Sequence, residues 1–407
     1  MDHPVRCREP RAREVAAVLR LDLDAVPRGP QVRSGPQDQL LRAGANPHYR
    51  NQRGGEGDEP THGESFLSMQ AALRRGENHV PVYPNRQVGN VATVSDLCTR
   101  ICDNIEQVIV GKRNAIRLAL ICVLCEGHIL LEDVPGVAKT MLARAIAISL
   151  GVGFRRVQCT PDLLPTDITG TSVFNQKTLD FEFRPGPIFT NILLADEINR
   201  ATPRTQSALL QAMAERHVSI DGHTYELERP HLVIATQNPI EHEGTFPLPE
   251  AQLDRFFMRL SIGYPSFQAE NDMILMLRLG HPIDTIGAVV TLEDLRKAQK
   301  ACREVHVDEK VRQYIIRLVQ ATRDPNNADF IMGASPRATQ CLYFACQATA
   351  ALVGREFVIP DDVKALCGPI LAHRVLLNPE ARLRGLTPHE AVRRLVENIP
   401  APVRQGV

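Results

Sequence analysis

Strand signals that alternate with helical stretches constrain the fold of this chain more than any other feature of its sequence. They have the length of buried strands, and they are Ile129–Leu131, Phe154–Cys159, Ile192–Ala195 and Leu232–Thr236. Helical stretches such as Met141–Leu150 and Pro203–Glu215 lie between them. Strands and helices in alternation form a parallel sheet that is covered on both faces. We therefore predict an α/β domain over residues 94–265.

The pattern changes after Pro265, where the strand signals stop. The remaining stretches are helical, and they are Phe267–Leu279, Leu292–Val305, Lys310–Ala321, Pro336–Val353, Asp361–Leu371 and Pro388–Glu397. We predict a second, all-helical domain over residues 266–407.

Residues 1–93 differ in composition from the rest of the chain. They contain arginine but no lysine, are dense in proline and glycine, and have one short apolar patch at Val15–Leu19. Such a segment buries too little apolar surface to offset the entropy of ordering. We predict either a disordered segment or a leader that precedes the true start at Met69. Order is predicted to begin near Val94, where Ser95 can cap a helix.

Composition excludes several classes of function. In the 407 residues, 47 basic side chains balance 47 acidic ones, which argues against nucleic-acid binding by bulk charge. The ten cysteines show neither a disulfide framework nor a zinc pattern, and unpaired thiols fit a reducing compartment. The apolar run Leu118–Cys125 is far shorter than the roughly 20 residues that span a bilayer. We expect a cytoplasmic protein with no membrane span.

A loop typical of phosphate binding follows the first predicted strand. Lys139 and Thr140 match the end of the pattern G-x-x-x-x-G-K-[ST], but Asp133 and Ala138 replace both of its framework glycines. The loop opens a helix whose first backbone N–H groups attract phosphate, although the pattern alone also fits a capped helix with a solvated lysine. We predict that Lys139 neutralises the β and γ phosphates of ATP and that Thr140 ligates Mg²⁺. The predicted loop contacts to ATP are Val134, Pro135, Gly136, Val137, Ala138, Lys139, Thr140 and Met141.

Polar residues end two further predicted strands. The third run leads into Asp196 and Glu197, and the fourth into Gln237, Asn238 and Pro239. Carboxyl ends of parallel strands meet at one edge of their sheet. Asp196 is predicted to hold Mg²⁺ directly or through water, Glu197 to polarise the attacking water, and Asn238 to orient it. Acidic residues at strand ends are often only solvated, so the interpretation depends on three elements converging on one edge.

Two short segments are predicted to be β-hairpins inserted into the α/β domain. Ser172–Phe174 and Leu179–Phe183 flank a turn at Asn175–Lys177. Val218–Ile220 and Thr224–Leu227 flank Asp221-Gly222, a strong hairpin signal. The loops of such hairpins are suited to touching a substrate, whereas the simpler alternative is that they cover a sheet edge.

These motifs together resemble those of the AAA+ ATPases and, within them, of the MoxR family. The resemblance runs from Ile105 to the C-terminus and is carried by the strings VIVG, LLEDVPGVAKT, TPDLLPTDITG, LLADEINRA, ATQNPIEHEGTFPLPEAQLDRF and GASPR. It implies a P-loop core with a parallel five-stranded sheet between helices and two hairpin inserts, followed by a helical lid domain. It also implies that Asp133 is usual in the first glycine position.

The resemblance implies roles for individual residues. Lys139 and Thr140 correspond to Walker A, Asp196 and Glu197 to Walker B, Asn238 to sensor 1 and Arg337 to sensor 2, with Val110 and Gly111 beside the adenine. Arg255 corresponds to an arginine finger that acts on the nucleotide of the neighbouring subunit, and Arg259 is the second choice for that role. A surface arginine paired with Asp254 or Glu250 is the alternative for Arg255.

The function implied is that of a Mg²⁺-dependent ATPase that assembles into a ring, expected to be a homo-hexamer, and remodels or matures client proteins. Its cofactors would be ATP and Mg²⁺. Its partners would be a protein with a von Willebrand factor A domain and a client enzyme. Two alternatives stay open: a nucleotide-binding scaffold with a weak ATPase, and a magnesium-chelatase-like subunit, since that family shares both inserts.

The N-terminal segment is predicted to be dispensable, because its composition supports no core and every motif lies beyond it. A chain that starts at Met69 should keep its rate of ATP hydrolysis and its assembly state, measured by phosphate release and size-exclusion chromatography. A fall in turnover of more than severalfold would show that the segment contributes to function.

Overall fold

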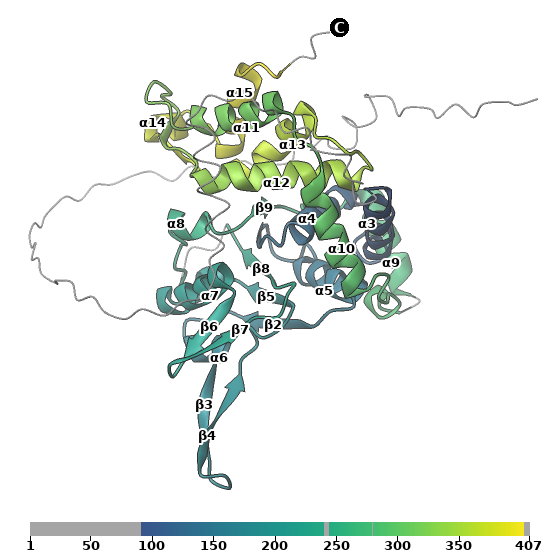
Figure 1. Ribbon diagram of the computed structural model, residues 1–407, viewed down its shortest axis with the longest axis vertical. Helices are drawn as coiled ribbons and strands as arrows, with labels where there is room; N and C mark the ends of the chain where they lie inside the picture. The colour runs from purple at the N-terminus through teal and green to yellow at the C-terminus, as the bar shows by residue number, and fades with distance from the viewer. Residues whose placement is uncertain (1–90, 240–243, 279, 403–407) are drawn as a thin grey trace, which may run out of the picture. The chain divides into compact units, whose positions relative to one another are not determined.

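The computed structural model of the protein describes residues 91–239, 244–278 and 280–402 (Figure 1). Helix α3 (Val91–Glu106) is the first described element, and it buries Val91 and Val94. Ser95 therefore lies inside this helix, where its carbonyl accepts a hydrogen bond from Thr99 Oγ1 at 2.8 Å. The prediction of a Ser95 cap is wrong, because burial of Val91 extends the helix by a turn. Residues 1–90 of the predicted leader lie outside the described residues.

A five-stranded parallel sheet forms the centre of the α/β domain, as predicted. Its strand order is β2-β5-β8-β1-β9. The strands are β1 (Ile129–Glu132), β2 (Phe154–Gln158), β5 (Ile192–Asp196), β8 (Leu232–Gln237) and β9 (Met258–Leu260). Of these five strands, only β9 has no counterpart among the predicted strand signals, because it has three residues and Arg259 interrupts its apolar character.

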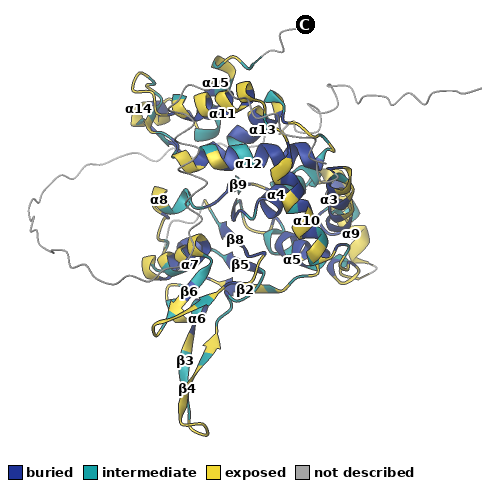
Figure 2. Ribbon diagram, in the orientation of Figure 1, coloured by how far each residue is buried: buried dark blue, intermediate teal, exposed yellow. Residues whose placement is uncertain are grey.

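Both faces of the sheet are buried, because neighbouring residues of a strand point to opposite faces. Ile129 and Leu131 belong to the hydrophobic cluster that includes α3, α4 (Arg113–Leu124) and α5 (Lys139–Leu150). Leu130 belongs to the cluster on the other face, which α6 (Pro165–Thr169) and α7 (Pro203–Glu215) cover. The central strands accordingly lie in the most buried part of the domain (Figure 2).

Strand register aligns the carboxyl ends of the central strands. Glu132 of β1 lies opposite Gln237 of β8, and Ala195 of β5 lies opposite Ala235. The residues that follow these strands, including Asp133 and Asn238, therefore leave the sheet at the same edge.

Both predicted hairpins are present. One pairs β3 (Gly170–Asn175) with β4 (Asp180–Pro185) and extends away from the sheet (Figure 1), and the other pairs β6 (His217–Ile220) with β7 (His223–Glu226). The base of the first hairpin is closed by Gly170 and Gly186, where any side chain would overlap the facing backbone. Its far end carries exposed apolar side chains, namely Phe174, Leu179 and Phe181.

The second domain is mainly helical. Its helices are α9 (Phe267–Leu277), α10 (Leu292–Glu304), α11 (Glu309–Ala321), α12 (Pro336–Leu352), α13 (Pro360–Leu371), α14 (Pro379–Leu383) and α15 (Pro388–Asn398). The expectation that strands stop after Pro265 is wrong in one detail, since β10 (Phe330–Met332) pairs antiparallel with β11 (Leu376–Leu377). Strands of two or three residues are too short to produce a periodic signal.

The lid and the α/β domain share one hydrophobic cluster, to which α3, α4, α12 and α13 all contribute. None of the described helices combines the length and apolar character needed to cross a bilayer. The nine described cysteines are all buried and free, as expected for thiols that act as small apolar side chains.

Candidate functional site

The phosphate loop joins β1 to the N-terminus of α5. Its last residue before the helix, Ala138, has the left-handed backbone angles φ 61° and ψ 28°. This conformation costs an L-residue about 1–2 kcal/mol, which is why a glycine is common here. No side chain caps α5, so the N–H groups of its first turn remain available to an anionic ligand. The strained alanine thus shapes a loop that leaves the N-terminus of α5 open.

Asp133, at the other substituted glycine position, anchors this loop. Its carboxylate is buried and accepts hydrogen bonds from Ser261 Oγ at 3.0 Å and from the backbone N–H groups of Ile262 and Gly263, both at 2.7 Å. The carboxylate therefore ties the loop to the segment that follows β9. Comparison with the glycine pattern could not reveal this role, because the partners lie about 130 positions later in the chain.

The side chain of Lys139 lies at the carboxyl ends of β1 and β8. Its Nζ donates to the carbonyl of Asp133 at 2.6 Å and to that of Gln237, the last residue of β8, at 3.5 Å. Partial burial lowers the pKa of Lys139, while the negative charges of neighbouring carboxylates, among them Asp196 and Glu197, act in the opposite direction. The structure thus brings the loop lysine and the acidic pair together.

Thr236 holds the acidic pair in place from the neighbouring strand. Its hydroxyl donates to Asp196 Oδ1 at 2.6 Å and accepts from the backbone N–H of Glu197 at 2.8 Å. Glu197 itself has a left-handed backbone, with φ 55° and ψ 52°. Strain of this kind in a non-glycine residue concentrates at functional sites.

Side chains of β2 also contact the acidic pair. Arg156 Nη2 forms an ion pair with Asp196 Oδ2 at 2.6 Å, and Gln158 Nε2 donates to Glu197 Oε2 at 3.0 Å. Arg200 Nη1 lies 3.2 Å from the same Glu197 oxygen. Sequence reasoning missed these residues, although residues two positions apart in a strand, such as Arg156 and Gln158 of β2, point to the same face.

The donors at this edge suit Mg²⁺. The carboxylate of Asp196 and the hydroxyl of Thr140, in the first turn of α5, are the hard oxygen ligands that this ion prefers. Within the described residues, the Thr140 hydroxyl makes no hydrogen bond. Asn238, predicted to orient a water, follows β8 directly.

Val110 and Gly111 lie near the anchored side of the loop. Lys112 Nζ donates to the carbonyl of Tyr264 at 2.6 Å, and a side chain on Gly111 would come within 3.4 Å of Ala269 in α9. The predicted adenine residues therefore adjoin the segment after β9 that Asp133 also holds.

The two arginines predicted for the finger role each contact another group of their own subunit. Arg255 follows α8 (Glu250–Leu253) in a turn. Its Nη1 donates to the carbonyl of Leu210 in α7 at 2.7 Å rather than pairing with either acidic neighbour. Arg259, the second choice, lies in β9 and pairs with Glu132 of its own subunit at 2.8 Å.

Arg337 lies in the first turn of α12 and is exposed. Its guanidinium makes no hydrogen bond or ion pair with any other described residue. An exposed, unpaired cation at this position can reach an anionic ligand without first breaking an internal contact.

The anchoring role of Asp133 predicts that restoring the motif glycine will harm the protein. Asp133→Gly should lower the free energy of unfolding by roughly 2–4 kcal/mol, because the buried N–H of Ile262 and the partly buried N–H of Gly263 lose their acceptor. It should also weaken ATP binding. Urea unfolding and titration with a fluorescent nucleotide measure both effects.

The matched control is Ala138→Gly, at the other substituted position. It relieves the left-handed strain and should raise stability by about 1 kcal/mol. An Asp133→Gly protein as stable as the parent would contradict the anchoring role.

Two family models match this chain. The model described as ATPase family associated with various cellular activities (AAA) matches residues 128–258, and the AAA lid domain model matches residues 326–395. In the solved structures, the chain resembles the crystal structure of a candidate ATPase from Cytophaga hutchinsonii, with a TM-score of 0.72 and 34% identity over 83% of this chain and 100% of that one.

The chain also matches curated relatives over nearly the whole length of each relative. Uncharacterized protein YeaC of Bacillus subtilis is 48% identical over 76% of this chain and 96% of its own. Chaperone MoxR1 of Mycobacterium tuberculosis is 40% identical over 78% of this chain and 86% of its own. Protein MoxR of Paracoccus denitrificans is 35% identical over 69% of this chain and 89% of its own. The chain therefore belongs to the MoxR family of AAA+ ATPases.

Proposed function

We propose that this protein is a Mg²⁺-dependent ATPase whose subunits act as a ring, expected to be a hexamer. The observation that carries the proposal is the convergence of Lys139, Asp196 and Glu197 at one sheet edge, next to the open N-terminus of α5. A cation, a metal-ligating carboxylate and a second carboxylate beside an anion-binding helix end are the groups that phosphoryl transfer to water requires.

Each group has a distinct role in this proposal. Lys139 and the first-turn N–H groups of α5 bind the phosphates of ATP, and Asp196 with Thr140 holds Mg²⁺. Bound Mg²⁺ supplies positive charge on the phosphate oxygens. Glu197 accepts hydrogen bonds from Gln158 and Arg200, which fix its carboxylate for polarising the attacking water. Asn238 orients that water.

Two arginines complete the proposed site from other elements. Arg337 of the lid reaches the γ-phosphate of its own subunit. Arg255 contacts α7 in its own subunit rather than its own loop, which supports a role at the nucleotide of the neighbour. The ring follows from this arrangement, because a site without an adjacent subunit lacks the second arginine.

ATP turnover is proposed to remodel or mature client proteins in the cytoplasm. The name of the relative MoxR1 includes the word chaperone, and buried free thiols fit a reducing compartment. The exposed aromatic end of the β3–β4 hairpin is the proposed client contact. By family resemblance, a protein with a von Willebrand factor A domain is the proposed partner.

A scaffold with weak ATPase is the second candidate. Two observations favour it: the left-handed strain at Ala138 and the ion pair that already engages the carboxylate of Asp196. Phosphate release separates the two functions, because a scaffold needs no turnover that depends on Glu197.

Removal of the Glu197 carboxylate should separate binding from hydrolysis. Glu197→Gln should lower phosphate release by about 100-fold or more, because the amide cannot accept a proton from water. ATP binding should persist, whereas Lys139→Ala should abolish it. A Glu197→Gln protein that hydrolyses ATP at the parental rate would refute the assignment, and a parent without measurable release would favour the scaffold.

Arg255→Ala should lower turnover by roughly 10³-fold, because it removes the cation that stabilises charge on the transferring phosphoryl group. ATP affinity should change little. When the Arg255→Ala protein is mixed with inactive Lys139→Ala subunits, activity should return, since an intact Lys139 site then faces an intact Arg255. Failure to recover in mixtures shown to co-assemble would mean that Arg255 acts only within its own subunit.

A further inference from the structure

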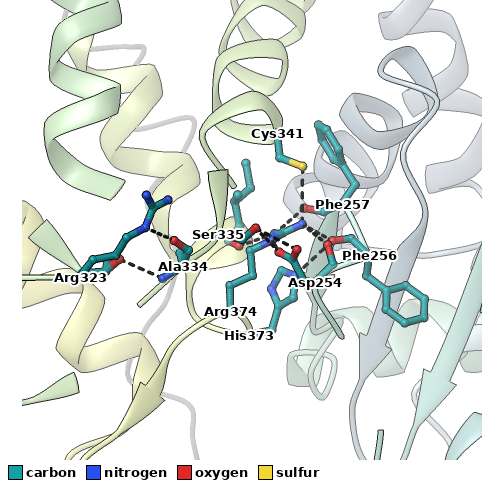
Figure 3. A network of polar contacts seen from close by, with 11 residues as sticks. Asp254, Phe256, Phe257, Arg323, Ala334, Ser335, Cys341, His373 and Arg374 are labelled. Atoms are coloured by element: carbon teal, nitrogen blue, oxygen red, sulfur yellow. Dashed lines mark hydrogen bonds and ion pairs between the residues drawn. The ribbon is translucent and has the colours of Figure 1, made fainter. Parts of the chain in front are cut away.

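The carboxylate of Asp254, immediately before Arg255, is held by two residues of the lid (Figure 3). Ser335 Oγ donates to Asp254 Oδ1 at 2.9 Å and to Oδ2 at 2.8 Å. Arg374 Nε donates to Asp254 Oδ1 at 2.9 Å. The residue before the proposed finger is thus attached to the lid as well as to the α/β domain.

Arg374 also holds the backbone on both sides of Arg255. Its guanidinium donates to the carbonyls of Asp254 and Phe257, each at 3.2 Å, and to that of Phe256. The Arg374 side chain is only 1% exposed, so its charge is compensated almost entirely by these partners. A buried guanidinium with this many acceptors holds them in a fixed geometry, because any displacement leaves a charge unpaired.

The Ser335 hydroxyl binds Asp254 and does not cap its own helix. Ser335 occupies the N-cap position of α12, yet its side chain makes no cap hydrogen bond. Other polar N-cap residues of the lid, such as Thr387 of α15, do cap their helices. The Ser335 hydroxyl instead joins Asp254 to the first turn of the helix that carries Arg337.

We infer that Asp254 is a positioning residue through which the lid sets the placement of Arg255. The inference rests on the proposed role of Arg255 at the neighbouring subunit. On this view, the turn that carries Arg255 and the first turn of α12, which carries Arg337, belong to one connected unit. A lid that moves with its own nucleotide then moves the finger, which couples adjacent sites.

Ser335→Ala is the variant that tests this inference with the least damage to the fold. It removes one donor to Asp254 and leaves the Arg374 contacts in place. We expect turnover to fall roughly 10- to 100-fold, as displacement of a catalytic group by about 1 Å does, with ATP affinity within about twofold of the parent. Ser335→Thr, which keeps the hydroxyl, should restore turnover.

Thr387→Ala is the matched control. It also removes a hydroxyl from an N-cap of the lid, but its partner is the backbone N–H of Glu390 and not Asp254. Its turnover should stay at the parental value. Asp254→Asn, which keeps the shape of the side chain but removes its charge, should lower turnover at least as much as Ser335→Ala. A Ser335→Ala protein with turnover within twofold of the parent would overturn the inference.

Subunit mixing distinguishes a misplaced finger from a lid that is merely loosened. In mixtures with excess Lys139→Ala subunits, each Ser335→Ala site faces a well-placed Arg255. Its rate per intact Lys139 should rise to that of parental subunits mixed in the same way. A defect that mixing does not repair, while Arg255→Ala is repaired, overturns the positioning role but leaves the proposed function intact. If mixing repairs neither the Ser335→Ala nor the Arg255→Ala protein, both the positioning role of Asp254 and the proposed role of Arg255 at the neighbouring subunit are overturned.

Discussion

The pairing of β8 between β5 and β1 is the constraint on which the candidate site depends. Parallel register ends the three strands at one edge, so the loop before α5, the acidic pair and the end of β8 are adjacent although up to about a hundred positions separate them in sequence. Thr236 adds a side-chain link across this pairing, since its hydroxyl contacts both Asp196 and the backbone of Glu197. Loss of register would move these groups apart by a full residue spacing.

The sequence predicted the parts of this site that local patterns encode. Buried runs identify β1, β5 and β8, and the residues that follow them can be named because carboxyl ends of parallel strands share an edge. Strand β9 was missed, since three residues with a central arginine give no apolar run. The roles of Asp133 and Arg374 were missed for another reason: their partners lie about 120 to 130 positions away, and such a residue looks like any surface charge in the sequence.

Two strained residues flank the place where a nucleotide would bind. Ala138 and Glu197 both adopt left-handed backbone angles, which most residues avoid. Each is held by its surroundings: Ala138 by a loop that Asp133 anchors, and Glu197 by Thr236 and the side chains around its carboxylate. The surrounding contacts therefore fix the geometry of the site before any ligand arrives, which reduces the reorganisation that catalysis would require.

The two glycines at the base of the β3–β4 hairpin have a mechanical consequence. Backbone packs directly against backbone there, with no side chain between the two segments. A two-stranded ribbon clamped in this way is stiff at its root, so a small rotation of the α/β domain is amplified with distance along it. The exposed rings of Phe174 and Phe181, near the far end, would sweep a wider arc than the residues at the base of this hairpin.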